Sequence, residues 1–415
     1  MSEVLTPQPW MVHPATMRVM DALADAGGRD CARFVGGCVR DALLGRSVTD
    51  IDIATTLRPD AATTALTAAG IKAIPTGIAH GTVTAATAGR TFEITSLRRD
   101  VETDGRHATV AFTDDWAEDA ARRDFHFNAL YANAAGEVFD PTGCGVADLR
   151  SGAVVFVGNA TTRIEEDALR ILRFFRFLAW YGRGEPDAEA LAACDAMRDR
   201  TANLSAERVS KELLKLLAAD DPREAVRLMA SSGVLSVVLP DATGLTRFDA
   251  LVRIETEQLF TNDPLLRLAA LLKNSPDAAR ATAERLRLSN ADRDRLVSAF
   301  GIEPVVSWIG PREVRRAIWR DGAGPLRDRV MLDWAASTRP AAATQWRALL
   351  PMIDSWPRPK FPLSGHEIEA AGVTPGPMLG KVMREVEAWW IDSDFSDDKL
   401  SMIERLKAVV QGLVY

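Results

Sequence analysis

The chain has 415 residues, enough for roughly two to four domains and more than one hydrophobic core. Its apolar share of 47% is ordinary for a globular protein, and no apolar run is long enough to span a bilayer, so we expect no membrane partner. The net charge of −7 argues against a protein that coats nucleic acid non-specifically, because such proteins use basic surfaces, but it allows an RNA substrate held by local basic patches.

The cysteines and the N-terminus indicate the compartment. The four scattered cysteines contain no C-x-x-C pair, so we expect neither a disulfide framework nor a zinc site. The first residues, MSEVLTPQPW, lack the basic start and apolar core of a signal peptide. Together these features predict a cytoplasmic protein.

Residues 34–53, FVGGCVRDALLGRSVTDIDI, predict a strand, a glycine turn, a short helix and a second strand. Gly36 and Gly37 let a backbone approach a ligand closely, and the free N–H groups of the helix would point at an anion. Because alternate side chains of a strand share a face, Asp50 and Asp52 are expected to lie together. Two carboxylates beside a phosphate-binding turn can hold two divalent metal ions about 4 Å apart, as attack on a nucleoside triphosphate requires.

The chain continues with a helix at 61–69 and an alternating pattern at 71–98 that predicts strands of a central sheet. Glu93 lies on one of these strands, where it could be a third carboxylate of the site or an ordinary strand residue. Arg98 closes that strand. Residues 99–112 are polar and contain a glycine, so they are predicted to form a mobile loop.

Residues 122–130, RRDFHFNAL, place charged and apolar side chains in close alternation. Paired arginines such as Arg122 and Arg123 normally lie on a solvated face. Here apolar residues surround them, which indicates that they are held in place. Residues 139–149, FDPTGCGVADL, predict a structural turn at the end of the N-terminal part.

Residues 163–182 have no internal glycine or proline and predict one long helix. Phe174 and Phe177 lie on its charged half, so that half is expected to be buried against another part of the protein. A guanidinium and a carboxylate one turn apart can read the hydrogen-bonding edge of a nucleobase. The charged half contains Glu166, Asp167, Arg170, Arg173 and Arg176.

A helix at 204–217 follows, and beyond residue 218 the pattern is almost wholly helical. The later helices are expected at 222–238, 247–274, 277–300, 311–319, 325–353 and 376–412. The predicted fold class is α+β, with a small mixed sheet in an N-terminal head followed by an all-helical neck, body and tail. The expected boundaries are 1–158, 159–220, 221–358 and 359–415.

Five of these segments resemble, in order, the motifs of one branch of the polymerase-β-like nucleotidyltransferases, namely the class II CCA-adding enzymes and bacterial poly(A) polymerases. The motifs lie at 34–53, 122–130, 139–149, 163–182 and 204–217. The chain departs from the family at His126, where threonine is usual, and at Cys144, where glycine is usual. The resemblance covers about the first half of the chain.

The resemblance implies a catalytic head, a neck helix that selects the nucleotide, and an RNA-binding body. Asp50 and Asp52, with Glu93 as the third candidate, would bind two Mg²⁺ ions. Asp167 and Arg170 would pair with the incoming base while Glu166 holds that arginine, so no nucleic-acid template is needed. The implied nucleotide-binding set is Gly36, Gly37, Arg40, Asp41, Arg98, Arg122, Arg123, Asp124, Asn128, Glu166, Asp167, Arg170, Arg173 and Arg176.

The expected activity is transfer of CMP and AMP from CTP and ATP to the 3′ end of tRNA, without a DNA partner. A poly(A) polymerase has the same motifs, but the acidic stretch IDSDFSDDKLS near the C-terminus favours a narrow tRNA substrate over many RNAs. A CC-adding enzyme has a shortened loop where 99–112 looks intact. A non-catalytic RNA-binding protein is disfavoured because both aspartates of Asp-x-Asp are present.

Overall fold

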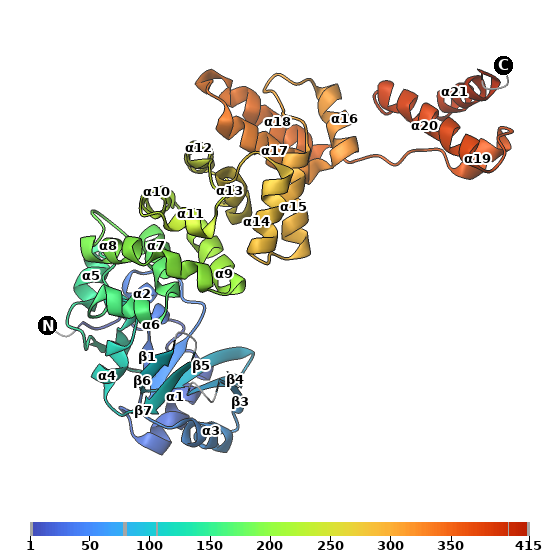
Figure 1. Ribbon diagram of the computed structural model, residues 1–415. Helices are drawn as coiled ribbons and strands as arrows, with labels where there is room; N and C mark the ends of the chain where they lie inside the picture. Colours follow the sequence, from blue (N-terminus) through green and yellow to red (C-terminus); the bar gives the residue numbers. More distant parts are fainter. Residues whose placement is uncertain (1–2, 78–80, 105–106, 397, 413–415) are drawn as a thin grey trace. The chain divides into compact units, whose positions relative to one another are not determined.

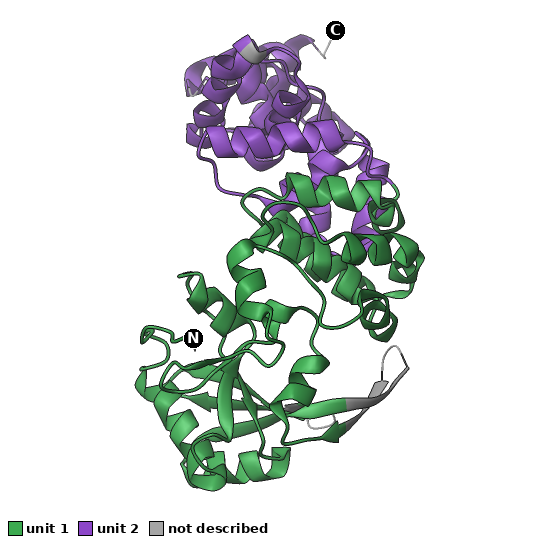
Figure 2. Ribbon diagram, turned by 90° about the vertical axis from the view of Figure 1, so that its left-hand side faces the viewer, with its two compact units in different colours: residues 1–240 green, residues 241–415 purple. Residues whose placement is uncertain are grey.

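The computed structural model describes residues 3–77, 81–104, 107–396 and 398–412 (Figure 1). It contains two compact units, residues 1–240 and residues 241–415 (Figure 2). Unit 1 holds a mixed sheet and helices, whereas unit 2 is helical, which confirms the α+β class. The finer boundaries at 158, 220 and 358 stay predictions.

The described part of unit 1 contains a seven-stranded sheet with the order β3-β4-β5-β2-β1-β8-β9. The pair β2 and β5 is parallel and the other pairs are antiparallel, so the sheet is mixed, as predicted. The strands are β1 Ala32–Val35, β2 Asp52–Thr55, β3 Lys72–Gly77, β4 Thr82–Thr87, β5 Arg90–Ser96, β8 Tyr131–Ala132 and β9 Val138–Phe139. β2 begins at Asp52, so Asp50 precedes the strand on which it was predicted.

The prediction of a loop at 99–112 is wrong, because residues 99–104 and 107–112 lie on two paired strands. Strand β6 (Arg98–Asp104) pairs with β7 (His107–Phe112) as a separate two-stranded sheet. Arg98 therefore begins β6 and does not close β5. The polar composition of this stretch favours a loop, and the sequence alone does not show that the two strands pair; Gly105 and Arg106 lie outside the described residues.

The hydrophobic core of the head lies against this sheet. Phe34, Ile53 and Phe92 are at most 1% exposed, as alternating apolar positions on neighbouring strands predict. The helices that accompany the sheet are α1 Pro14–Gly27, α2 Gly37–Leu43, α3 Pro59–Ala68, α4 Trp116–Ala121 and α5 Gly145–Ser151 (Figure 1).

The single helix predicted at 163–182 is two helices, α6 (Ala160–Glu166) and α7 (Leu169–Tyr181). Asp167 interrupts them in an extended conformation, and its Oδ1 accepts a hydrogen bond from the backbone N–H of Leu169 at 3.0 Å, as a helix cap does. Periodicity alone could not reveal this break, because the residues on both sides keep the helical spacing. Unit 1 ends with α8 Ala188–Ala196, α9 Ala206–Leu217, α10 Arg223–Ser231 and α11 Val234–Val238.

Unit 2 contains shorter helices than the sequence predicted. They are α12 Leu245–Glu257, α13 Pro264–Leu271, α14 Pro276–Arg285, α15 Asn290–Gly301, α16 Pro311–Asp321, α17 Ala323–Ala336, α18 Ala343–Ser355, α19 Gly365–Ala370, α20 Pro377–Asp392 and α21 Lys399–Gly412. The predicted helix 247–274 is wrong because Asp263 caps a new helix with proline at its first position. Likewise 222–238 breaks at Gly233, whose φ is 71°. The predicted helices 277–300, 325–353 and 376–412 are each divided between two α-helices.

The end of the chain packs within unit 2 through an aromatic cluster. Trp390 is 2% exposed, and Trp319 and Phe395 each lie with their ring centroids 5.0 Å from it. Arg316 forms an ion pair with Asp392 at 2.5 Å. In the parts of the chain that the structure describes, no helix combines the length and the apolarity needed to cross a membrane.

A fully buried ion pair in unit 2 gives a prediction about stability. The Nε of Arg267 lies 2.6 Å from Oε2 of Glu255, and the two side chains are 0% and 1% exposed. Arg267→Ala is expected to lower the free energy of unfolding by about 3–5 kcal/mol, because it leaves a buried carboxylate without its cation. Denaturant unfolding followed by tryptophan fluorescence measures this loss.

The double variant Arg267→Met/Glu255→Leu is the matched control. It removes both charges and fills the space, so it should recover most of the lost stability. If Arg267→Ala lowered the free energy of unfolding by less than about 1 kcal/mol, the buried pair would not stabilise unit 2 in the way proposed.

Candidate active site

A cavity of about 560 Å³ in unit 1 brings together residues from the first, second, fourth and fifth motifs. The side of α7 and the glycine turn both contribute to its wall. Of the predicted site residues, it is lined by Gly36, Gly37, Arg40, Asp41, Asp50, Asp52, Arg123, Asp124, Asn128, Arg173 and Arg176. Residues separated by more than 100 positions in the sequence therefore share one cavity.

The glycine turn needs glycine for its backbone conformation. Gly36 has φ 70° and ψ −122°, which side-chain-bearing residues rarely adopt, and its N–H donates to the carbonyl of Leu130 at 3.1 Å. A Cβ at this position would meet its nearest atoms only at 3.7 Å, so conformation and not lack of space requires glycine. The turn leads directly into α2, which presents Arg40 to the cavity.

The carboxylates cluster around Asp52. Asp52 and Glu93 are register partners on the parallel strands β2 and β5, and Asp50 precedes β2. Burial, together with the negative charges of Glu93 and Asp50, raises the pKa of Asp52 from 3.8 to about 6. A bound cation would relieve this repulsion, so the donor set fits a divalent metal.

These carboxylates do not form a complete metal site alone. Among the residues that the structure describes, no three or more His, Cys, Asp or Glu side chains are grouped closely enough to hold a metal. A divalent ion commonly keeps several waters and takes substrate phosphate oxygens as ligands beside one or two carboxylates. Asp50 and Asp52 match that pattern, and Glu93 does not line the cavity.

Arg123 is fixed in the cavity wall by a buried aspartate that sequence reasoning missed. Asp119 on α4 is 1% exposed and accepts hydrogen bonds from Arg123 at 2.9 Å and from Tyr131 at 2.7 Å. Burial alone would raise the pKa of Asp119, but the positive charges of Arg123 and Arg122 lower this pKa to about 2. The carboxylate therefore stays ionised and holds both arginines.

The structure does not place Arg122 or Arg98 in the cavity. Arg122 donates to Asp119 at 2.6 Å and to the carbonyl of Arg98 at 3.0 Å. These contacts match the expectation that the paired arginines are held in place. They give Arg122 and Arg98 a structural part in this arrangement.

A buried chain of hydrogen bonds fixes the other arginines. Arg40 donates to Asn128 at 2.6 Å, Asn128 donates to Asp124 at 3.0 Å, and Arg173 donates to Asp124 at 2.7 Å. Burial opposes the negative charge of Asp124, but Arg173 and Asn128 keep the pKa of Asp124 below its ordinary value. The network holds two guanidinium groups at the cavity before any ligand arrives.

Arg176 completes this group of cations. It forms an ion pair with Glu212 of α9 at 3.1 Å, and Glu212 is 5% exposed. Burial, with Arg173 beside it, lowers the pKa of Arg176 to about 10. Four arginines therefore line a cavity that four aspartates also line. Asp41 and Asp124 pair with Arg40 and Arg173, and Asp50 and Asp52 lie beside this group, a charge pattern suited to a triphosphate with bound metal.

The three candidate base-pairing residues lie at the break between α6 and α7. Glu166 accepts a hydrogen bond from Arg170 at 2.5 Å, which is the contact that the family resemblance implies. Arg170 also donates to the carbonyl of Arg122 at 2.9 Å, and Asp167 forms an ion pair with Arg208 at 2.6 Å. Their role in reading a base stays a prediction.

Sequence reasoning missed Tyr181, although a signal was present. Tyr181 follows Arg170 by 11 residues, about three helical turns, so it lies on the same face of α7. Its hydroxyl donates to Asp41 at 2.8 Å, and the guanidinium of Arg40 lies 4.3 Å from its ring centroid. Lys215 of α9 also lines the cavity, and burial and Arg176 lower its pKa.

Tyr181→Phe is expected to raise the KM for nucleotide about tenfold with little change in kcat. It removes a hydrogen bond to a charged group but keeps the ring under Arg40. Tyr181→Leu removes both contacts and should cost more. Steady-state kinetics with each nucleotide measures the effect, and an unchanged KM in both variants would contradict a positioning role.

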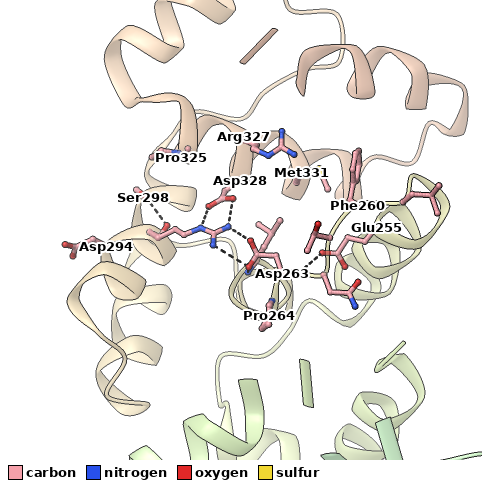
Figure 3. A pocket seen from close by; sticks show the side chains of 16 residues that line it. Glu255, Phe260, Asp263, Pro264, Asp294, Ser298, Pro325, Arg327, Asp328 and Met331 are labelled. Atoms are coloured by element: carbon pink, nitrogen blue, oxygen red, sulfur yellow. Dashed lines mark hydrogen bonds and ion pairs between the residues drawn. The ribbon is translucent and has the colours of Figure 1, made fainter. Parts of the chain in front are cut away.

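A second, larger cavity of about 1000 Å³ lies within unit 2 and contains none of the predicted site residues (Figure 3). Arg295 spans it between Asp263 at 2.5 Å and Asp328 at 2.7 Å. Arg327 at its edge pairs with Asp354 at 2.7 Å. Of the side chains that line this cavity only Arg295 and Arg327 are cationic, against four arginines and Lys215 in the first cavity, so it is the poorer site for a triphosphate.

Comparison with known proteins agrees with the class of enzyme that this cavity defines, a nucleotidyltransferase. Residues 32–155 match the family model described as "Poly A polymerase head domain". Residues 185–245 match "Probable RNA and SrmB- binding site of polymerase A".

Proteins with similar sequences identify the family within the nucleotidyltransferases to which the chain belongs. CCA tRNA nucleotidyltransferase 1, mitochondrial, of Mus musculus is 34% identical, with 90% of this chain and 86% of the relative covered. The CCA-adding enzyme of Lactobacillus delbrueckii subsp. bulgaricus is 29% identical, with 95% and 98% covered. The chain belongs to the family of CCA tRNA nucleotidyltransferases, which confirms the predicted resemblance.

Solved structures share the fold. The Bacillus stearothermophilus CCA-adding enzyme in complex with CTP has a TM-score of 0.75 and 24% identity, covering 97% of this chain and all of that one. The Thermotoga maritima CCA-adding enzyme complexed with tRNA has a TM-score of 0.67 and 19% identity, covering 99% and 100%.

Proposed function

We propose that this protein completes the 3′ end of tRNA by adding C, C and A without a nucleic-acid template. In each step the terminal 3′-oxygen of the tRNA bonds to the α-phosphorus of CTP or ATP, and pyrophosphate leaves. The observation that carries the proposal is the cavity that unites Asp50 and Asp52 with the arginine group, in a chain 34% identical to a CCA tRNA nucleotidyltransferase over 90% of its length.

The chain's own residues bind and orient the triphosphate. Arg40, Arg123, Arg173 and Arg176 would offer planar donors to phosphate oxygens, and their buried partners hold them in position beforehand. Such preorganised charge stabilises the negative charge that develops as the phosphoryl group is transferred. Gly36 and Gly37 let the phosphates approach the backbone.

Asp50 and Asp52 are the residues that would hold Mg²⁺, with Glu93 raising the local negative charge. Bound divalent ions would supply activation of the 3′-hydroxyl and neutralisation of the leaving pyrophosphate. The raised pKa of Asp52 supports a cation at this position. By holding the divalent ions that accompany the triphosphate, Asp52 would also help to orient its phosphates next to the four arginines.

Asp167 and Arg170 would select the base. Cytosine and adenine both present an amino donor beside a ring-nitrogen acceptor, whereas uracil and guanine present the reverse order. A carboxylate that accepts from the amino group and a guanidinium that donates to the ring nitrogen therefore favour C and A. Glu166 orients Arg170 through the hydrogen bond described above.

The proposal is tested by incorporation of labelled CTP and ATP onto tRNA transcripts that end before CCA, after C and after CC. Extension by two C and one A, with an unrelated RNA left unextended, is the expected result. Long A tails on both RNAs would make the protein a poly(A) polymerase. A stop after CC would make it a CC-adding enzyme.

We propose a cytoplasmic location, which the four free cysteines support because disulfides are rare in that compartment. The Mus musculus and Homo sapiens relatives are named mitochondrial, so the compartment needs its own measurement. Cell fractionation followed by immunoblotting should place the protein in the cytosolic fraction.

A further inference from the structure

Trp308 in unit 2 is exposed to a degree that folding does not explain. It is 63% exposed, more than any other Phe, Tyr or Trp among the residues that the structure describes, and neighbouring Val306 is 40% exposed. A large indole left in solvent marks an interaction site when polar groups surround it.

The segment that presents Trp308 is held rigidly. The N–H of Val305 donates to Asp333 of α17 at 2.7 Å, and the hydroxyl of Ser307 donates to Gln345 of α18 at 2.8 Å. Asp333 also accepts from Arg329 at 2.8 Å, so its charge is compensated. These hydrogen bonds fix the backbone on both sides of Val306, next to Trp308, so binding a ligand at the indole costs less conformational entropy.

A small cavity adjoins the indole, and one of the side chains that line it carries a buried donor without a partner. The cavity holds about 290 Å³ and is lined by Trp308, Arg339 and Trp346 among others. Trp346 is 4% exposed, yet its Nε1 finds no hydrogen-bond acceptor in the described part of the chain. A buried N–H without a partner costs free energy, so an acceptor supplied by a ligand would restore the missing bond.

Arg339 gives the site its charge. Its guanidinium lies 5.6 Å from the centroid of the Trp308 ring. Among the described residues it makes no ion pair with a carboxylate, so its positive charge stays available. An indole face, a guanidinium and an N–H donor are the groups that bind an unstacked nucleobase and its phosphate.

We propose that Trp308, Arg339 and the cavity beside Trp346 form a binding site for one unpaired nucleobase of the tRNA substrate. The base would stack on the indole of Trp308, its carbonyl or ring nitrogen would accept from Trp346, and Arg339 would contact the adjoining phosphate. A cavity of this size suits a single base and is too small for a folded stem. The inference rests on the proposed function, because that function supplies the tRNA.

The direct test is the dissociation constant of full-length tRNA lacking CCA, measured by fluorescence anisotropy. Trp308→Ala should weaken binding about tenfold, as expected for the loss of one base–aromatic stack, whereas Trp308→Phe should stay within about threefold of wild type. Arg339→Ala should reduce the slope of log K against log salt by about one, and Trp308→Ala should leave that slope unchanged. Leu400→Ala, which truncates another exposed apolar side chain, is the control.

Turnover separates this inference from the proposed function. At saturating tRNA, Trp308→Ala should keep kcat within about twofold of wild type, because a lost binding contact raises KM alone. A wild-type protein that incorporates no nucleotide would refute the proposed function, whereas normal tRNA affinity in Trp308→Ala would overturn only this inference.

Two further outcomes are decisive. If Trp308→Ala melts at a lower temperature, Trp308→Leu and Trp308→Phe are compared, since both fill the space and only phenylalanine keeps a ring; equal tRNA affinity in the two would overturn the stacking site. If Trp308→Ala changes the sedimentation coefficient but not the tRNA affinity, the surface is a protein contact and the proposal is wrong.

Discussion

Asp52→Asn is expected to lower incorporation of CMP and AMP by at least about a thousandfold, since metal-ion catalysis contributes several kcal/mol and each 1.36 kcal/mol is tenfold in rate. The amide keeps the size of the carboxylate but binds a divalent cation poorly. Asp50→Asn should show a similar loss. Rapid-quench incorporation of labelled CTP at saturating tRNA measures both variants.

Stability distinguishes this loss from misfolding. The pKa of Asp52 rises from 3.8 to about 6 on folding. The ionised carboxylate therefore lowers the stability of the folded protein above about pH 6. This destabilisation decreases as the pH falls and is absent below the pKa of 3.8 in the unfolded chain. Asp52→Asn removes this charge, so its melting temperature at pH 7 should equal or exceed that of wild type. Asp60→Asn, on the exposed first turn of α3, is the control, and it should change neither nucleotide incorporation nor the melting temperature. Incorporation within tenfold of wild type by either site variant would refute the metal assignment.

Arg170→Ala is expected to abolish discrimination between nucleotides while leaving tRNA affinity within about twofold of wild type. A bidentate arginine contact to a base is worth about 1–3 kcal/mol of discrimination, so the preference for CTP over UTP should fall by roughly one to two powers of ten. Incorporation of CMP should also fall, because the base is no longer held for attack. Competition between CTP and UTP in single-turnover reactions measures the preference.

Two further variants serve as controls for Arg170→Ala. Arg170→Lys keeps the charge but not the planar fork, so it should lose discrimination almost as fully as alanine does. Arg198→Ala removes a 42% exposed arginine paired with Asp195 and should behave as wild type. If Arg170→Ala weakened only tRNA binding, the base-selecting role would be wrong.

The sequence predicted well which residues gather around one cavity, because the patterns that indicate them are local. Glycines in a turn, carboxylates beside a strand and charged residues on one helix face all appear within short windows. Eleven of the predicted residues line one cavity for that reason. The buried charged half of α7 was also predictable, since Phe174 and Phe177 among arginines have no stable place in solvent.

Other features depend on contacts between distant segments. Asp119 looks like an ordinary acidic residue of a short helix, and only the fold shows that it holds Arg122 and Arg123. The break at Asp167 arises because its carboxylate caps α7 and pairs with Arg208, some 40 residues later. Helical periodicity cannot report such contacts.

The most direct test of the central account is the sequence of the 3′ ends produced from a tRNA lacking CCA in an equal mixture of ATP, CTP, GTP and UTP. We expect nearly all completed ends to read CCA, because selection resides in the protein and needs no template strand. Ends with U or G at comparable frequency, or extended runs of A, would contradict an enzyme that selects C and A through Asp167 and Arg170.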